Sequence, residues 1–119
     1  MPFEEYTPKV MDHFLNPRNT GEVPEPTHSA LVRNPVCGDL VKLTVRVKDG
    51  IVVEARTKTF GCAAAIASSS ALTELLQGTS VEVARRIKNS DVVLHLGGLP
   101  EHKVACSVVA EQAVLEAFK

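Results

Sequence analysis

Three cysteines and one aspartate are the residues of this chain whose types and surroundings best suit metal or sulfur chemistry. Cys37, Cys62 and Cys106 are its only cysteines, and Asp39 follows the first of them in the segment N-P-V-C-G-D at residues 34–39. Thiolate sulfur is a soft ligand that suits zinc and iron–sulfur clusters. An odd number of widely spaced cysteines is not typical of a disulfide framework. The alternative is three buried thiols that act as small apolar side chains.

Each cysteine lies at the boundary of a predicted element. Cys37 precedes a glycine and an acid in a tight turn before a strand, where an acid buried without a partner would be costly. Cys62 stands at the start of a helix predicted over residues 63–76, and Cys106 falls in the first turn of a helix predicted over residues 102–118. Helix N-termini favour a thiolate. We therefore expect the cysteines to converge at one edge of a sheet in a shared metal or sulfur site.

The elements that position these residues predict an α+β fold. Residues 40–48 alternate apolar and polar side chains, which indicates a strand with one face in water. Asp49-Gly50 is a type I′ hairpin signal that leads to a partner strand over residues 51–60, and residues 30–33 form a weaker third strand. Helices are predicted over residues 6–15, 63–76, 80–88, 91–96 and 102–118. In the first of them, Thr7 is the expected N-cap and Pro8 the expected first residue, and the apolar face is expected to hold Val10, Met11, Phe14 and Leu15. The expected fold is a three-stranded antiparallel sheet with helices packed on one face, a short N-terminal helix and a helical C-terminal half.

Length, charge and composition exclude several function classes. A chain of 119 residues with 45% apolar residues is expected to form one domain over residues 1–119, with a core that needs no metal for folding. A net charge of −1 without a long basic run disfavours nucleic-acid binding. No apolar stretch approaches the ~18 residues of a membrane span, and the N-terminus lacks the layout of a signal peptide. We therefore expect a cytoplasmic protein.

Three longer motifs point to a known family. Residues 12–21 read D-H-F-L-N-P-R-N-T-G, residues 35–39 read P-V-C-G-D, and residues 59–70 read T-F-G-C-A-A-A-I-A-S-S-S. In this order they resemble the signatures of the U-type iron–sulfur scaffold family, which comprises IscU and the N-terminal domain of NifU. The resemblance covers essentially the whole chain.

The resemblance implies a scaffold that builds an iron–sulfur cluster and hands it to apo acceptor proteins, without itself being an enzyme. It implies that Cys37, Cys62 and Cys106 are cluster ligands and that Asp39 controls or shares ligation. Cys106 would accept persulfide sulfur from a cysteine desulfurase, and the apo site would take up zinc. A [2Fe–2S] cluster is expected, because three thiolates and one carboxylate supply four ligands within one chain. A monomer and a homodimer both remain open.

The chain departs from the family pattern at two places. Ala105 stands where most relatives have a histidine before the last cysteine, which leaves Asp39 as the expected fourth ligand and His102 as the alternative. Residues 99–103 read L-P-E-H-K in place of L-P-P-V-K, which argues against recognition by a dedicated Hsp70-type chaperone. His13 is expected to be structural or at a partner surface, and the two other histidines are expected on the surface or in the core.

Two alternative functions use the same residues. A structural or regulatory zinc protein could hold a tetrahedral ion with them, although the wide separations between the cysteines do not resemble a compact zinc module. A sulfur-transfer enzyme could use Cys106 as its nucleophile without any cluster.

Overall fold

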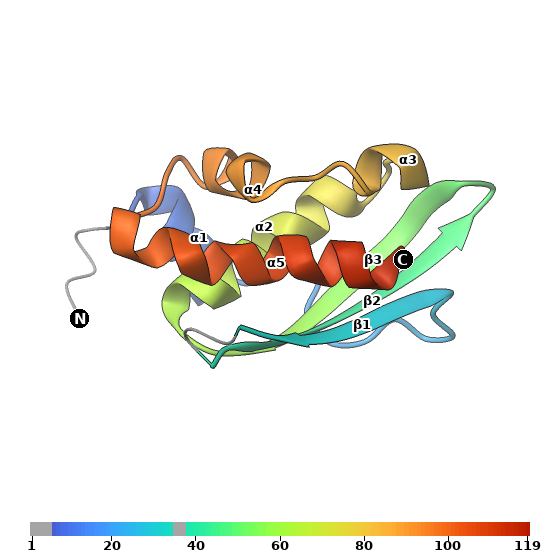
Figure 1. Ribbon diagram of the computed structural model, residues 1–119, viewed down its shortest axis with the longest axis horizontal. Helices are drawn as coiled ribbons and strands as arrows, with labels where there is room; N and C mark the ends of the chain where they lie inside the picture. Colours follow the sequence, from blue (N-terminus) through green and yellow to red (C-terminus); the bar gives the residue numbers. More distant parts are fainter. Residues whose placement is uncertain (1–5, 35–37) are drawn as a thin grey trace.

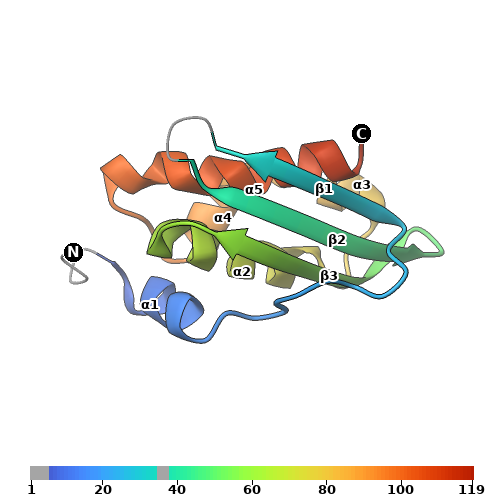
Figure 2. The same cartoon turned by 90° about the horizontal axis from the view of Figure 1, so that it is seen from below.

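The sheet has three antiparallel strands in the order β1-β2-β3 in the computed structural model, which describes residues 6–34 and 38–119. The strands are β1 (His28–Arg33), β2 (Leu40–Lys48) and β3 (Ile51–Phe60). The helical elements are α1 (Pro8–Leu15), α2 (Ala63–Leu76), α3 (Val81–Ala84), α4 (Asn89–His95), the 3₁₀ turn η2 (Glu101–Lys103) and α5 (Val104–Ala117). The helices lie on one face of the sheet (Figure 1), and the opposite face is free of helices (Figure 2). The predicted α+β architecture is confirmed.

The β2–β3 hairpin follows directly from the sequence. Asp49 and Gly50 have φ angles of 54° and 76°, as a type I′ turn requires, and Lys48 pairs with Ile51 across it. On the inner face of β2, Val41, Leu43 and Val45 are fully buried, as the alternation predicts, and Val47 near the turn is partly buried. Thr44 on the opposite face is also buried, because its Oγ1 accepts a hydrogen bond from the Val23 N–H at 2.9 Å. The segment between α1 and β1 therefore covers part of the face that was expected to be in water.

The same segment protects the free edge of β3. The Gly21 N–H donates to the Thr57 carbonyl at 3.0 Å, and the Thr57 N–H donates to the Asn19 carbonyl at 3.0 Å. An edge strand with unpaired N–H and C=O groups is prone to pair with other chains, and a covering segment prevents this. Figure 2 shows the segment after α1 running beside β3. This pairing fixes the position of α1 beside the sheet.

Helix α1 begins as its sequence predicts, and its buried face differs from the expected one at Leu15 and His13. Thr7 is the N-cap, its Oγ1 accepts from the Val10 N–H at 3.1 Å, and Pro8 is the first helical residue. Leu15, expected on the apolar face, is 67% exposed, whereas His13 is buried against α2. Burial away from water lowers the pKa of the His13 imidazole below its ordinary value. Helix α1 therefore packs through both Val10 and His13, and the His13 Nδ1 lies 2.7 Å from Ser70 Oγ of α2.

Helix α2 is the central element of the fold. It contacts α1, α4, α5 and β3, and it is buried on nearly all sides. Its many alanines and serines let these neighbouring elements approach closely. Leu72 and Leu76 are its largest fully buried side chains. The helix covers Ala63–Leu76 as predicted, and the chain turns away at Gly78 with a φ of 85°.

The C-terminal helices differ from prediction at their ends. Ser80 caps α3, since its Oγ accepts from the Val83 N–H at 3.2 Å, but the helix ends at Ala84 rather than at residue 88. The Ile87 N–H bonds to the Ala84 carbonyl at 3.2 Å, so the chain tightens into a turn that buries Ile87. The last predicted helix is divided into η2 and α5, and Cys106 lies in the first turn of α5 as expected.

Among the described residues, no helix is both long enough and apolar enough to cross a membrane.

Candidate functional site

Asp39, Cys62 and Cys106 meet at one place in the structure. Each offers one ligand atom, and the three atoms all lie within 4.8 Å of one another. Asp39 and Cys106 are 4% and 2% exposed, whereas Cys62 is half-buried. The three side chains come from the turn before β2, the N-cap of α2 and the first turn of α5. The fourth predicted site residue, Cys37, lies outside the described residues.

The Asp39 carboxylate is held at the N-terminus of α2. The Cys62 N–H donates to Asp39 Oδ1 at 3.2 Å, and the Cys62 thiol lies 3.8 Å from Oδ2. Cys62 has the backbone conformation of an N-cap but makes no capping bond with its own side chain. A carboxylate at this position satisfies an exposed N–H and suits the positive end of the helix dipole. One acid therefore both caps α2 and contacts a candidate ligand.

Gly61 makes this approach possible. A Cβ at position 61 would lie 2.3 Å from Asp39 Oδ1 and 2.9 Å from Asp39 Cβ. These separations are far below ordinary contact distances, so any side chain here would displace the aspartate. Glycine is therefore required before the second cysteine for steric reasons, and the sequence alone did not reveal this requirement.

We expect Gly61→Ala to weaken metal retention by moving the Asp39 carboxylate away from Cys62. Anaerobic reconstitution of an iron–sulfur cluster, followed by gel filtration, measures the fraction retained. If Gly61→Ala acts by displacing Asp39, it should cause little further loss of cluster in a protein that already carries Asp39→Ala, since the effects of coupled residues are not additive. Equal, additive losses in the two backgrounds would show that Gly61 acts independently of Asp39.

Asn34 joins the turn before β2 to the helix that carries Cys106. Its Nδ2 donates to the Ala105 carbonyl at 2.9 Å, and its N–H donates to the Asp39 carbonyl at 2.8 Å. The Gly38 N–H donates back to the Asn34 carbonyl at 2.7 Å, and Gly38 has a φ of 74°, which favours glycine. Asn34 was not predicted as a site residue. Its neighbouring proline was the only local signal, and that signal does not reveal a contact 71 residues away.

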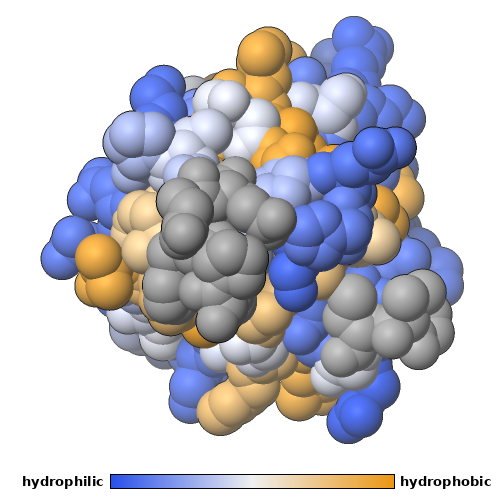
Figure 3. All heavy atoms as spheres, turned by 90° about the vertical axis from the view of Figure 1, so that its left-hand side faces the viewer, coloured by the Kyte–Doolittle hydropathy of each residue, from blue (hydrophilic) through white to orange (hydrophobic). Residues whose placement is uncertain are grey.

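The two departures from the family pattern lie at the start of α5. Ala105 is exposed, and His102 is exposed within η2. In the part of the chain that the structure describes, the ligand group around Cys62 contains Asp39 and Cys106 but not His102. The group lies toward the end of the molecule where α2 and α5 begin (Figure 1). Hydrophilic and hydrophobic side chains are interspersed over the visible surface of that end (Figure 3).

Residues 5–119 match the family described as the NifU-like N-terminal domain. The chain is 47% identical over 117 residues to "Iron-sulfur cluster assembly scaffold protein IscU" of Escherichia coli K12, which covers 95% of this chain and 91% of the relative. It is 46% identical over 113 residues to "Iron-sulfur cluster assembly scaffold protein IscU 1" of Archaeoglobus fulgidus, covering 95% and 74% of the two chains. It is also 44% identical over 119 residues to "Iron sulfur cluster assembly protein 2, mitochondrial" of Saccharomyces cerevisiae, covering 96% and 76%.

Solved structures share the fold at lower identity. A NifU-like N-terminal protein of Brucella abortus superposes with a TM-score of 0.74 at 21% identity, over 97% of this chain and 92% of the other. A Fervidobacterium islandicum protein, provisionally described as a scaffold of the SUF system, gives 0.79 at 18% identity over the whole of both chains. The fold, the motifs and the sequence identity agree, and the chain belongs to the family of NifU-like N-terminal domains.

Proposed function

We propose that this protein is a scaffold on which an iron–sulfur cluster is assembled from iron and desulfurase-derived sulfur, and from which the cluster passes to apo acceptor proteins. The observation that carries the proposal is the Asp39–Cys62–Cys106 group, with ligand atoms within 4.8 Å of one another. Relatives of this chain are named as cluster assembly scaffolds, which supports the same role here.

The proposed ligands are Cys37, Asp39, Cys62 and Cys106, and the proposed cargo is a [2Fe–2S] cluster. Three thiolates and one carboxylate make four ligands, the number that such a cluster takes. A carboxylate oxygen is a harder and weaker partner for cluster iron than sulfur is. A site with one such ligand should release its cargo more readily than four cysteines would, which suits a donor. Without iron, the same donors can hold zinc in a tetrahedral site.

The proposed sulfur acceptor is Cys106. Its thiolate attacks the outer sulfur of the desulfurase persulfide, the S–S bond breaks, and the desulfurase cysteine leaves as a thiolate. Each transferred sulfur then needs two electrons from an external dithiol or redox protein to become sulfide. Because Cys106 is 2% exposed, its neighbours must move when the desulfurase docks.

We expect desulfurase treatment to add sulfur to Cys106, and Cys106→Ser to abolish this transfer more completely than Cys62→Ser does. Mass spectrometry of peptides from the treated protein locates the added sulfur. Cys62 is more exposed than Cys106, so non-specific sulfur transfer would modify Cys62 first, and Cys62→Ser is therefore the demanding control. Sulfur found on Cys62 or Cys37, with Cys106 unmodified, would contradict the assignment.

Cluster transfer tests the proposed function. The protein is reconstituted anaerobically with ferrous iron, cysteine, a desulfurase and dithiothreitol, freed of small molecules and mixed with an apo-ferredoxin. We expect the visible absorption and circular dichroism of the scaffold to be replaced by those of the holo-ferredoxin. Zinc binding without a coloured cluster would instead support a zinc protein. Persulfide turnover without iron uptake would support a sulfur-transfer protein.

A further inference from the structure

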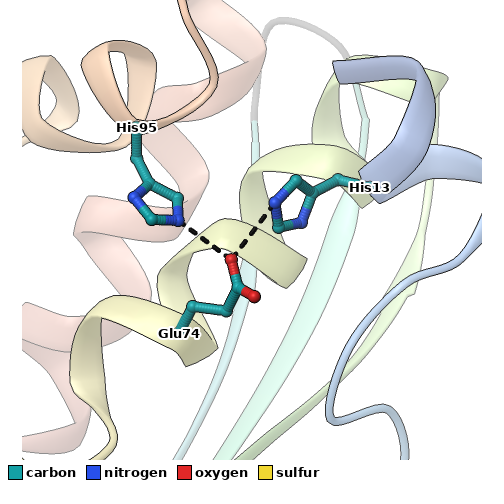
Figure 4. Close-up of side chains that lie close together, drawn as sticks. All are labelled: His13, Glu74 and His95. Atoms are coloured by element: carbon teal, nitrogen blue, oxygen red, sulfur yellow. Dashed lines mark hydrogen bonds and ion pairs between the residues drawn. The ribbon is translucent and has the colours of Figure 1, made fainter. Parts of the chain in front are cut away.

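A second group of metal-ligating side chains lies outside the cysteine site. His13 of α1, Glu74 of α2 and His95 of α4 converge, with both imidazole rings directed at one carboxylate (Figure 4). Glu74 Oε1 lies 3.2 Å from His13 Nε2 and 2.9 Å from His95 Nε2. One ligand atom from each residue lies within 4.8 Å of the others. Three different helices thus present two nitrogens and one oxygen to a single point.

This group is separate from the cysteine site. Glu74 follows Cys62 by 12 residues along α2, which corresponds to about 18 Å at ~1.5 Å per residue of helix. A single ion cannot contact both groups over that length.

We propose that His13, Glu74 and His95 form a mononuclear site for a divalent transition-metal ion, with Zn²⁺ and Fe²⁺ as the two ions whose ligand preferences the set fits. Neutral imidazole and carboxylate are ligands of both ions, and two histidines with one carboxylate leave coordination positions open for water. Ligands placed 2.0–2.2 Å from a tetrahedral ion lie about 3.3–3.6 Å from one another. The two nitrogen–oxygen separations in the structure, 3.2 and 2.9 Å, are somewhat shorter, so the side chains must move apart by a few tenths of an ångström to hold an ion.

The His13 ring has the outer hydrogen bond that metal-binding histidines usually have. Its Nδ1 lies 2.7 Å from Ser70 Oγ, which leaves Nε2 directed at the proposed ion. Ser70 precedes Glu74 by four residues, so both face α1 from the same side of α2. The Arg18 N–H also donates to Ser70 Oγ at 2.8 Å, which holds the hydroxyl in place. With metal on Nε2, the ring proton sits on Nδ1 and is donated to Ser70.

The Glu74 carboxylate is oriented by a cation on its other side. Oε2 lies 3.9 Å from Arg18 Nε, and the Arg18 guanidinium is itself paired with Asp12. This arrangement leaves Oε1 for the two histidines. The Glu74 and His95 side chains are 35% and 34% exposed, whereas the His13 side chain is 6% exposed. An ion can therefore enter from the solvent side, where water completes its coordination.

The test uses the full-length chain and two ions separately: Zn²⁺, and Fe²⁺ under anaerobic conditions. Isothermal titration calorimetry counts the sites, and histidine side-chain NMR identifies the nitrogens that bind. Removing a residue that hydrogen-bonds a metal ligand weakens metal binding by about 10–100-fold. Removing a ligand should cost at least as much, so we expect His95→Gln and Glu74→Gln to weaken metal binding at this site by at least about 100-fold. His28→Gln is the matched control, because His28 packs against Phe118 at a ring distance of 5.0 Å, away from the site.

Binding at the proposed site should shift the Nε2 resonances of His13 and His95 but not those of His28. It should also raise the melting temperature of the wild type and the control more than that of His95→Gln, because the ion fastens α1, α2 and α4 together. Glutamine keeps a hydrogen-bonding group at position 95, so a purely structural role would leave metal binding unchanged. Equal zinc and iron affinities in all four proteins, with unshifted His13 and His95 resonances, would overturn the proposal. This outcome would leave cluster assembly at the cysteine site untouched.

Discussion

Cys62→Ser should abolish retention of an iron–sulfur cluster while the domain stays folded. Cys62 is half-buried and makes no capping bond through its side chain, so serine removes little packing and no helix cap. Serine oxygen is a harder and weaker ligand for cluster iron than thiolate. Cys37→Ser and Cys106→Ser should have the same effect, because each removes one of three proposed thiolates. The core consists of apolar side chains from the sheet and the helices, so we expect the fold to persist without a bound metal.

Visible absorption after anaerobic reconstitution and desalting measures retention, and far-UV circular dichroism checks the fold. Ala105→Ser is the matched control, since it adds a hydroxyl at an exposed position next to Cys106 without removing a thiol. We expect the control to keep its cluster. A cysteine variant that reconstitutes with an unchanged spectrum would show that this cysteine is not a ligand.

Asp39→Cys should lengthen the lifetime of the bound cluster, and Asp39→Ala should shorten it or drive the cluster to bridge two chains. Asp39 is 4% exposed and its carboxylate lies within 4.8 Å of the two described thiols, which supports its proposed role as the fourth ligand within a single chain. Cysteine there supplies a softer donor that holds iron more tightly. Alanine leaves a coordination position for water, a small thiol or a second chain.

Asp39→Asn separates ligation from packing, since the amide keeps the shape of the side chain and an acceptor for the Cys62 N–H but loses the charge. Cluster decay after dilution, with the mass of the complex from light scattering, compares the four proteins. The lifetimes should follow the order Cys, Asp, Asn, Ala, with a tenfold change corresponding to about 1.4 kcal/mol. A monomeric Asp39→Ala that holds its cluster longer than the wild type, without added thiol, would show that the carboxylate only promotes release.

The elements that local chemistry determines could be predicted from the sequence. The Asp49-Gly50 turn, the Thr7-Pro8 start of α1 and the whole of α2 appear where the pattern places them. Each depends on caps, turns and periodicity within a few residues. The C-terminal end of α3 and the exposure of Leu15 could not be predicted, because they depend on the burial of Ile87 and His13 through contacts with distant segments.

The convergence of Asp39, Cys62 and Cys106 could be predicted from the sequence, but the residues that hold them in place could not. Cysteines at element boundaries indicated a shared site, and Asp39 stood beside one of them. The steric need for Gly61 and the bond from Asn34 to Ala105 depend on contacts between distant segments. The His13–Glu74–His95 group was even harder to predict from the sequence, because no single sequence motif contains all three residues. Only the four-residue spacing of Ser70 and Glu74 on one helix could have suggested it.

The most direct measurement is the iron and acid-labile sulfide content of the protein after anaerobic reconstitution with a desulfurase and removal of unbound ions. Every protein compared carries His95→Gln, so that the proposed histidine site adds no iron of its own. If Cys37, Asp39, Cys62 and Cys106 hold a cluster, iron and sulfide should be recovered in equal amounts with visible charge-transfer absorption. Both should be lost together in Cys62→Ser. Zinc or iron bound without sulfide, or sulfide and iron retained in full by Cys62→Ser, would contradict the scaffold role proposed for this site.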